Sequence, residues 1–224
     1  MTGVVCKYNG ECKFVGLCYF ILQTLAISVF LRKFAPYNNK TATTMNIAIF
    51  CSANSGIDHH FFQLTEELGT WLAENGHTVV FGGCDMGLME CVARAAHDAG
   101  GRTMGMIPAK VEERGHVSKY VDVEFRCDNL SDRKDLMLAH SDVLIALPGG
   151  IGTLDEIFTV AASATIGYHA KKVILYDMDG FWQPLIALLD SLQDRGLMRA
   201  PYSRHIMVAD SLEEIAAIID GEKA

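Results

Sequence analysis

The fold of this chain is decided by the stretch Val143-Leu144-Ile145-Ala146-Leu147-Pro148-Gly149-Gly150-Ile151-Gly152-Thr153-Leu154-Asp155-Glu156. An apolar run typical of a buried strand leads into a glycine-rich turn, and a helical pattern of apolar residues follows. A strand, a glycine turn and a helix start together present backbone N–H groups to an anion. The glycines let the chain turn tightly and let a ligand approach the backbone. The stretch therefore predicts an anion site in an α/β protein.

Strands and helices alternate from Met45 onward. We expect strands at Asn46–Cys51, Thr78–Phe81, Thr103–Ile107, Val143–Leu147, Val173–Tyr176 and Ile206–Val208. We expect helices at Phe61–Glu74, Leu88–Ala99, Ser131–His140, around Ile157–Ala161, at Trp182–Arg195 and from Leu212, and assign no element to the polar segment 109–129. Such alternation predicts a single domain with a doubly wound parallel sheet, a three-layer, Rossmann-like α/β fold.

Three turns rich in glycine or serine follow the strands that end at Cys51, Phe81 and Leu147. In parallel α/β sheets, ligands bind outside the carboxyl ends of the strands, which is where all three turns belong. We therefore expect the binding residues there to include Ser52, Gly82, Gly83, Gly87 and the glycine-rich loop that begins at Gly149.

The composition narrows the choice of partners. The 224 residues are 50% hydrophobic and 21% charged, with a net charge of -8, which fits one domain with a sizeable core. The acidity argues against a nucleic-acid partner, for which a basic stripe is expected. Seven cysteines without a Cys-x-x-Cys pair indicate neither a disulfide framework nor a zinc site, so we expect no metal and a cytoplasmic location.

Residues 1–44 do not match the rest of the chain. The apolar run over residues 14–31 is at the lower limit of length for a membrane helix, and a basic pair, Arg32-Lys33, follows it. Three interpretations stay open: an over-extended start with Met45 as the true initiator, a membrane anchor, or a targeting signal. We expect the domain to comprise residues 45–224, with a membrane partner only if residues 14–31 are a true anchor.

Two further features suggest chemistry. Thr153-x-x-Glu156 fits a capping box, in which Glu156 would only bond the Thr153 N–H, but it also places a carboxylate just beyond an anion site. Arg133 and Lys134 lie in the first turn of an expected helix, where cations oppose the helix dipole, so they indicate an anionic ligand or a solvated basic pair.

With these residues in place, the chain resembles the Lonely Guy family of cytokinin-activating phosphoribohydrolases, long labelled lysine decarboxylases. The resemblance covers Met45 to the C-terminus. It rests on Pro148-Gly149-Gly150-Ile151-Gly152-Thr153-Leu154-Asp155-Glu156, on Asp132-Arg133-Lys134 and on Gly82-Gly83-x-x-x-Gly87-Leu88-Met89. The chain departs from the family pattern at Cys84, Glu90 and Leu130-Ser131.

The resemblance implies hydrolysis of the N-glycosidic bond of adenosine 5′-monophosphate (AMP), or of an N6-modified (cytokinin riboside) 5′-monophosphate, to the free base and ribose 5-phosphate. It implies Arg133 and Glu156 as catalytic residues, with Lys134 and the loop Gly149–Asp155 contacting the substrate. It also implies a homodimer or an assembly of dimers.

Two rival functions stay open. A non-catalytic module of the same fold would bind the nucleotide without cleaving it. A pyridoxal-phosphate decarboxylase would need a Schiff-base lysine, and Lys134 beside Arg133 in a phosphate site is poorly suited to that role. We therefore expect no cofactor.

Overall fold

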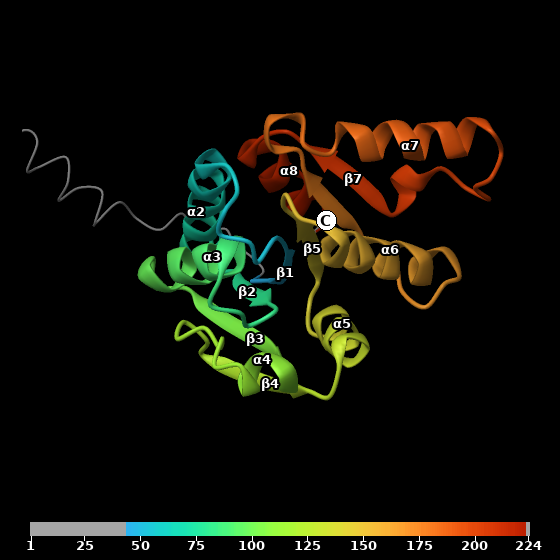
Figure 1. The fold of residues 1–224 in the computed structure, drawn as a ribbon. Coiled ribbons are helices and arrows are strands. Elements are labelled where there is room, and N and C mark those ends of the chain that lie inside the picture. The colour runs from blue at the N-terminus through green and yellow to red at the C-terminus, as the bar shows by residue number, and fades with distance from the viewer. Residues whose placement is uncertain (1–43, 223–224) are drawn as a thin grey trace, which may run out of the picture. The chain divides into compact units, whose positions relative to one another are not determined.

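The computed structural model describes residues 44–222, which form one parallel sheet with helices on both faces (Figure 1). The strands are β1 (Asn46–Phe50), β2 (Thr78–Phe81), β3 (Arg102–Pro108), β4 (Val123–Cys127), β5 (Val143–Ala146), β6 (Val173–Tyr176) and β7 (Ile206–Ala209). Their order in the sheet is β4-β3-β2-β1-β5-β6-β7, and every pairing is parallel. This is the predicted doubly wound, Rossmann-like architecture.

Two hydrophobic cores separate the helices into layers. One core joins the sheet to α2 (His59–Glu74), α3 (Gly87–Asp98) and α8 (Leu212–Glu222). The other joins the opposite face to α5 (Leu130–Ala139), α6 (Ile151–Thr165) and α7 (Gln183–Asp194). The short helix α4 (Ala109–Glu113) follows β3, and two 3₁₀ turns, η1 (Met178–Gly180) and η2 (Tyr202–Arg204), complete the described elements. The three-layer prediction is confirmed.

The segment 109–129 is more ordered than the sequence analysis predicted. It contains α4 and the edge strand β4, which pairs with β3 from Met104↔Val123 to Pro108↔Cys127. In β4 the side chains of Glu124 and Arg126 are exposed and alternate with more buried ones. The prediction of no element here was wrong because an edge strand with one solvated face carries as many polar as apolar residues.

Two predictions concern residues at the start of the chain. The candidate membrane span 14–31 and the proposed boundary after residue 44 fall almost entirely outside the described residues. Among residues 44–222, none of the helices is long and apolar enough to cross a membrane.

Strands β1 and β5 form the switch point of the sheet. The chain moves from β1 toward β4 on one side and from β5 toward β7 on the other. The loops after β1 and β5 therefore leave in different directions, and in folds of this type the ligand crevice lies at the carboxyl ends of these strands.

Candidate active site

Main-chain hydrogen bonds connect the loops that follow β1, β2 and β5. The Ser52 N–H donates to the Pro148 carbonyl at 3.1 Å, and the Leu88 N–H donates to the Ser52 carbonyl at 2.9 Å. The Gly87 N–H donates to the Ser55 hydroxyl at 3.3 Å. The prediction that these turns lie at one edge of the sheet is confirmed. Ser52, in the turn after β1, links the turns that follow β2 and β5.

Two glycines in these loops are required by close packing. Gly87 has φ +60°, and a Cβ atom there would lie 2.5 Å from the carbonyl carbon of Ala53. A Cβ atom on Gly149 would lie 2.1 Å from Thr153 Oγ1. Larger residues at either position would force the loops apart, so these glycines hold the crevice in shape.

The start of α6 is open. Gly150 is its N-cap residue and makes no side-chain cap, so the first N–H groups of the helix have no such partner. A Cβ atom on Gly150 or Gly152 would meet nothing within 4 Å. By contrast, the Asn129 side chain caps α5 by accepting from the N–H groups of Ser131 and Asp132 at 2.9 and 3.1 Å. The open end of α6 is therefore suited to bind an anion such as phosphate.

Arg133 of α5 and Glu156 of α6 form a buried ion pair beside this helix start. Arg133 Nη2 donates to Glu156 Oε1, and the two side chains are only 12% and 3% exposed. The guanidinium lies against Gly82, because a Cβ atom there would be 2.9 Å from Arg133 Nη1. Gly82 thus makes room for Arg133 at the end of β2.

Burial raises the pKa of the Glu156 carboxyl group to about 7, although the attraction of Arg133 lowers it in part. A carboxylate with this pKa changes its charge near neutral pH, which is typical of groups in active sites. The capping-box interpretation of Glu156 is wrong. Thr153 is the third residue of α6 rather than its N-cap, and Arg133 binds the Glu156 carboxylate.

Lys134 and Asp155 form a second ion pair between the same helices. Lys134 Nζ donates to both carboxylate oxygens of Asp155, at 2.8 and 2.7 Å, and to the Thr159 hydroxyl at 3.0 Å. These contacts use all three donors of the ammonium group. Lys134 could thus contact a phosphate directly only by giving up one of these three hydrogen bonds.

The sequence analysis gave no role at the site to three residues that lie near it. Thr159 stands four residues after Asp155, a spacing that would have placed both on one helix face. The Met89 sulfur lies 3.2 Å from the Cβ position of Gly82. Burial and the neighbouring Glu156 raise the pKa of the Cys51 thiol, which follows β1 at the carboxyl edge. The position of Cys51 at the carboxyl end of a strand could have identified it as a residue near the site.

The described residues contain no group of three or more His, Cys, Asp or Glu side chains that could hold a metal ion. Two ion pairs join the start of α6 to α5: Arg133–Glu156 and Lys134–Asp155.

Comparison with known proteins agrees with this geometry. Residues 89–219 match the family described as "Possible lysine decarboxylase". The cytokinin riboside 5′-monophosphate phosphoribohydrolase LOG5 of Arabidopsis thaliana is 33% identical over 178 residues, which cover 79% of this chain and 78% of that protein. The chain belongs to the Lonely Guy family.

Other members are equally similar. The cytokinin riboside 5′-monophosphate phosphoribohydrolase LOG1 of Arabidopsis thaliana is 34% identical over 170 residues, covering 75% of this chain and 79% of that protein. Among solved structures, the molybdenum cofactor binding protein of Rippkaea orientalis superposes with a TM-score of 0.63 at 23% identity, over 81% of this chain and 99% of that one. The molybdenum cofactor carrier protein of Chlamydomonas reinhardtii gives 0.61 at 24% identity, over 80% and 98%. These two structures share the fold of the Lonely Guy family.

Proposed function

We propose that this protein is an N-glycosidase that hydrolyses AMP, or an N6-modified AMP of the cytokinin type, to the free base and ribose 5-phosphate. The observation that carries the proposal is the buried Arg133–Glu156 pair beside the uncapped start of α6. Relatives at 33–34% identity carry the name cytokinin riboside 5′-monophosphate phosphoribohydrolase, which supports the same reaction.

The geometry suggests how each part contributes. The phosphate binds the open N–H groups of α6, with Gly150 and Gly152 leaving space for its oxygens. This places the ribose near Glu156. Cleavage of the bond between C1′ and the base nitrogen develops positive charge on the ribose, and the Glu156 carboxylate stabilises that charge within a buried site. The base leaves with the bonding electrons and takes up one proton. A water molecule adds to C1′ and releases one proton, which gives ribose 5-phosphate.

Arg133 has three functions in this proposal. Its hydrogen bond fixes the orientation of the Glu156 carboxylate, and its charge favours the ionised form of that group. Its remaining N–H groups are available to the phosphate or to the departing base. A lysine could not replace it, because a single ammonium lacks the planar fork of donors.

Incubation with AMP, an N6-alkylated AMP and adenosine tests the proposal. We expect free base from both nucleotides, and much slower release from adenosine, because adenosine lacks the phosphate that binds α6. Chromatography of the products and a ribose 5-phosphate assay measure the reaction. Recovery of intact AMP from a protein that binds it would instead support the non-catalytic nucleotide-binding alternative.

The lysine decarboxylase function has little support in the site. Lys134 Nζ is engaged in hydrogen bonds to Asp155 and Thr159, whereas a Schiff-base lysine must present a free amine.

A cytoplasmic location remains part of the proposal. Within residues 44–222 the cysteines are free thiols, as expected in a reducing compartment: Cys51, Cys84, Cys91 and Cys127.

The homodimer also remains a proposal. Leu130 and Ile151 are 60% and 83% exposed, and each lies one helical turn before a member of the Lys134–Asp155 pair. Exposed apolar side chains at the starts of α5 and α6 are what an interface with a second copy of the chain would cover. Sedimentation should give twice the mass of one chain, and Leu130→Glu should shift the protein toward the monomer. A monomer at micromolar concentration would contradict the proposal.

A further inference from the structure

A second cavity lies between α6 and α7, away from the candidate active site. Its volume is about 840 Å³, within the range of roughly 300–1,000 Å³ that is usual for small-molecule sites. Its walls include Phe158 and Thr165 of α6, Leu189 of α7, and the segment 197–206 that leads into β7.

The cavity belongs to the opposite edge of the sheet from the anion loop. Ile206, which lines it, is the first residue of β7, whereas Gly150 follows the carboxyl end of β5. The first α6 residue in the cavity wall is Phe158, seven residues after Ile151. This separation corresponds to about 10 Å along the helix axis. A ligand here would not occupy the nucleotide crevice.

The walls are mainly aliphatic and aromatic, and some of these side chains remain open to solvent. Phe158, Ile166 and Leu197 are 40%, 68% and 64% exposed. Exposed apolar side chains gathered around a cavity indicate a surface that binds an apolar group.

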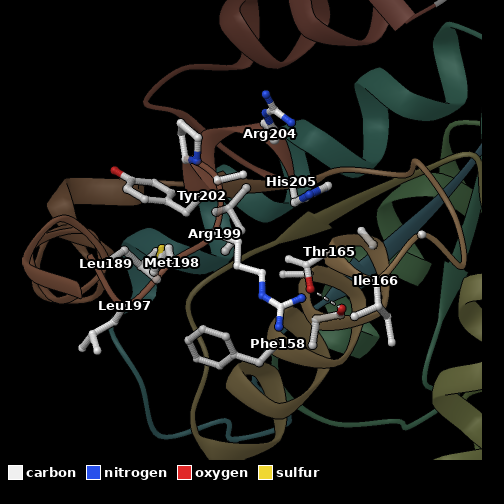
Figure 2. A pocket seen from close by; sticks show the side chains of 17 residues that line it. Phe158, Thr165, Ile166, Leu189, Leu197, Met198, Arg199, Tyr202, Arg204 and His205 are labelled. Atoms are coloured by element: carbon white, nitrogen blue, oxygen red, sulfur yellow. Dashed lines mark hydrogen bonds between the residues drawn. The ribbon is translucent and has the colours of Figure 1, made fainter. Parts of the chain in front are cut away.

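The charged groups at the cavity are all basic. Figure 2 shows the Arg199 side chain reaching from the segment after α7 toward Phe158 and Thr165, with Arg204 and His205 at another part of the wall. None of the lining residues is acidic, although the chain as a whole has a net charge of -8. Within the part of the chain that the structure describes, neither arginine forms an ion pair.

His205 supplies an independent observation. Its Nδ1 atom is buried and has no hydrogen-bond partner. A buried polar atom without a partner costs free energy unless a ligand or another group satisfies it. The histidine lines the same cavity as the two arginines, and its Nδ1 atom can meet a ligand group there only if the ring turns toward the cavity.

We propose that this cavity binds a small amphipathic anion, with an aliphatic or aromatic body and one carboxylate or phosphate group. The body packs on Phe158, Leu189 and Ile166, while the anionic group binds Arg199. This site is separate from the nucleotide crevice and does not depend on the proposed reaction.

Calorimetric titration of the full chain tests this proposal with four probes that share one alkyl body: decanoate, decyl phosphate, decanol and decyltrimethylammonium. We expect the two anions to bind, decanol to bind about tenfold more weakly, and the cation not to bind. The relative affinity of decanoate and decyl phosphate identifies which anionic group the site prefers. Binding of the cation as tight as that of the anions would overturn the proposal.

Variants assign the binding to this cavity. Arg199→Gln should weaken decanoate binding about tenfold and leave decanol binding unchanged, because only the charge contact is lost. The matched control is Arg195→Gln, which changes an exposed arginine at the end of α7 that does not line the cavity. Ala162→Phe, on the exposed face of α6, should fill the cavity and abolish the binding of both probes. Thermal melting checks that each variant is folded.

Saturating AMP should leave decanoate binding unchanged. Displacement of decanoate by AMP would place the probe in the nucleotide crevice and contradict a separate site. The proposal would also fail if no probe bound, or if Ala162→Phe changed only the mass in sedimentation. The latter result would show that a second copy of the chain covers this surface.

Discussion

Replacing Glu156 with glutamine removes one negative charge and keeps the shape of the side chain. Glutamine can still accept the hydrogen bond from Arg133, so we expect the variant to fold. If the carboxylate stabilises positive charge on the ribose, kcat for AMP should fall by about 10²-fold or more. Steady-state kinetics and thermal melting of both proteins measure the two effects.

The control for this substitution is Glu66→Gln, which removes an exposed carboxylate of α2 and should leave kcat unchanged. A fully active Glu156→Gln variant would contradict the catalytic assignment. The anion loop would then be a binding site only, and the protein would be a nucleotide-binding module.

The raised pKa of Glu156 predicts how activity depends on pH. The ionised form is the active one in our proposal, so kcat/KM should rise with pH through about 7 and then level off. Arg133→Ala should lose most of its turnover. Its residual kcat/KM should rise only at higher pH, because the Arg133 charge no longer lowers the pKa of Glu156. A flat profile between pH 5 and 9 would contradict this assignment.

The same pKa predicts the pH dependence of stability. The folded-state value of about 7 lies above the ordinary 4.5, so the stabilising contribution of Glu156 is full below pH 4.5 and is lost as pH rises toward 7. Glutamine does not titrate. As the pH increases from 4.5 to 8, the Tm of Glu156→Gln minus the Tm of the unaltered protein should therefore increase. Calorimetry measures both values. A constant difference in Tm would contradict the raised pKa.

Residue types in the site could be predicted from the sequence, but their partners could not. The glycine loop indicated an anion site, and the resemblance assigned Arg133 and Glu156. Their direct contact depends on α5 and α6 lying side by side on one face of the sheet, which spacing alone does not determine. For the same reason the pairing of Lys134 with Asp155 was not predicted.

At the scale of the element, the start of α6 depends on the absence of a side chain at Gly149. Gly149→Ala would place a methyl group 2.1 Å from Thr153 Oγ1 and push the loop from the helix. We expect a loss of about 1–3 kcal/mol in the free energy of unfolding, together with weaker AMP binding. Urea denaturation and calorimetric titration measure these changes.

Gly152→Ala is the matched control for stability, because a Cβ atom at that position meets nothing within 4 Å. It should leave the free energy of unfolding unchanged or slightly higher, since alanine favours a helix more than glycine does. Equal stability of Gly149→Ala and Gly152→Ala would contradict the packing argument.

The elements that the sequence predicted well are those buried on both faces or strongly periodic. Residues Thr78–Phe81 and Val173–Tyr176 form strands with the predicted bounds, and both strands lie inside the sheet. Strand β4 was missed because it lies at the edge, where alternating residues such as Glu124 and Arg126 face solvent. Its order depends on pairing with β3, a contact that no local pattern reports.

At the scale of the whole molecule, we predict that a chain beginning at Met45 folds and keeps its activity. Strand β1 begins at Asn46, and every residue assigned to the site lies after it. The yield of folded protein and the rate of AMP hydrolysis should match those of the full chain. Loss of both in the shortened chain would assign a structural function to residues 1–44.

The pairing of β1 with β5 also determines when the site can form during synthesis. Asn46 N–H donates to Asp142 at 2.8 Å across 96 residues of sequence, and the strands pair from Ile47↔Val143 to Phe50↔Ala146. Contacts between residues so far apart in sequence form late in folding, because a long loop must close first. A nascent chain on the ribosome thus lacks the candidate active site until β5 and α6 have emerged. Truncation of the message before Glu156 would leave strands β1–β5 without the complete helix α6 and without the Arg133–Glu156 pair.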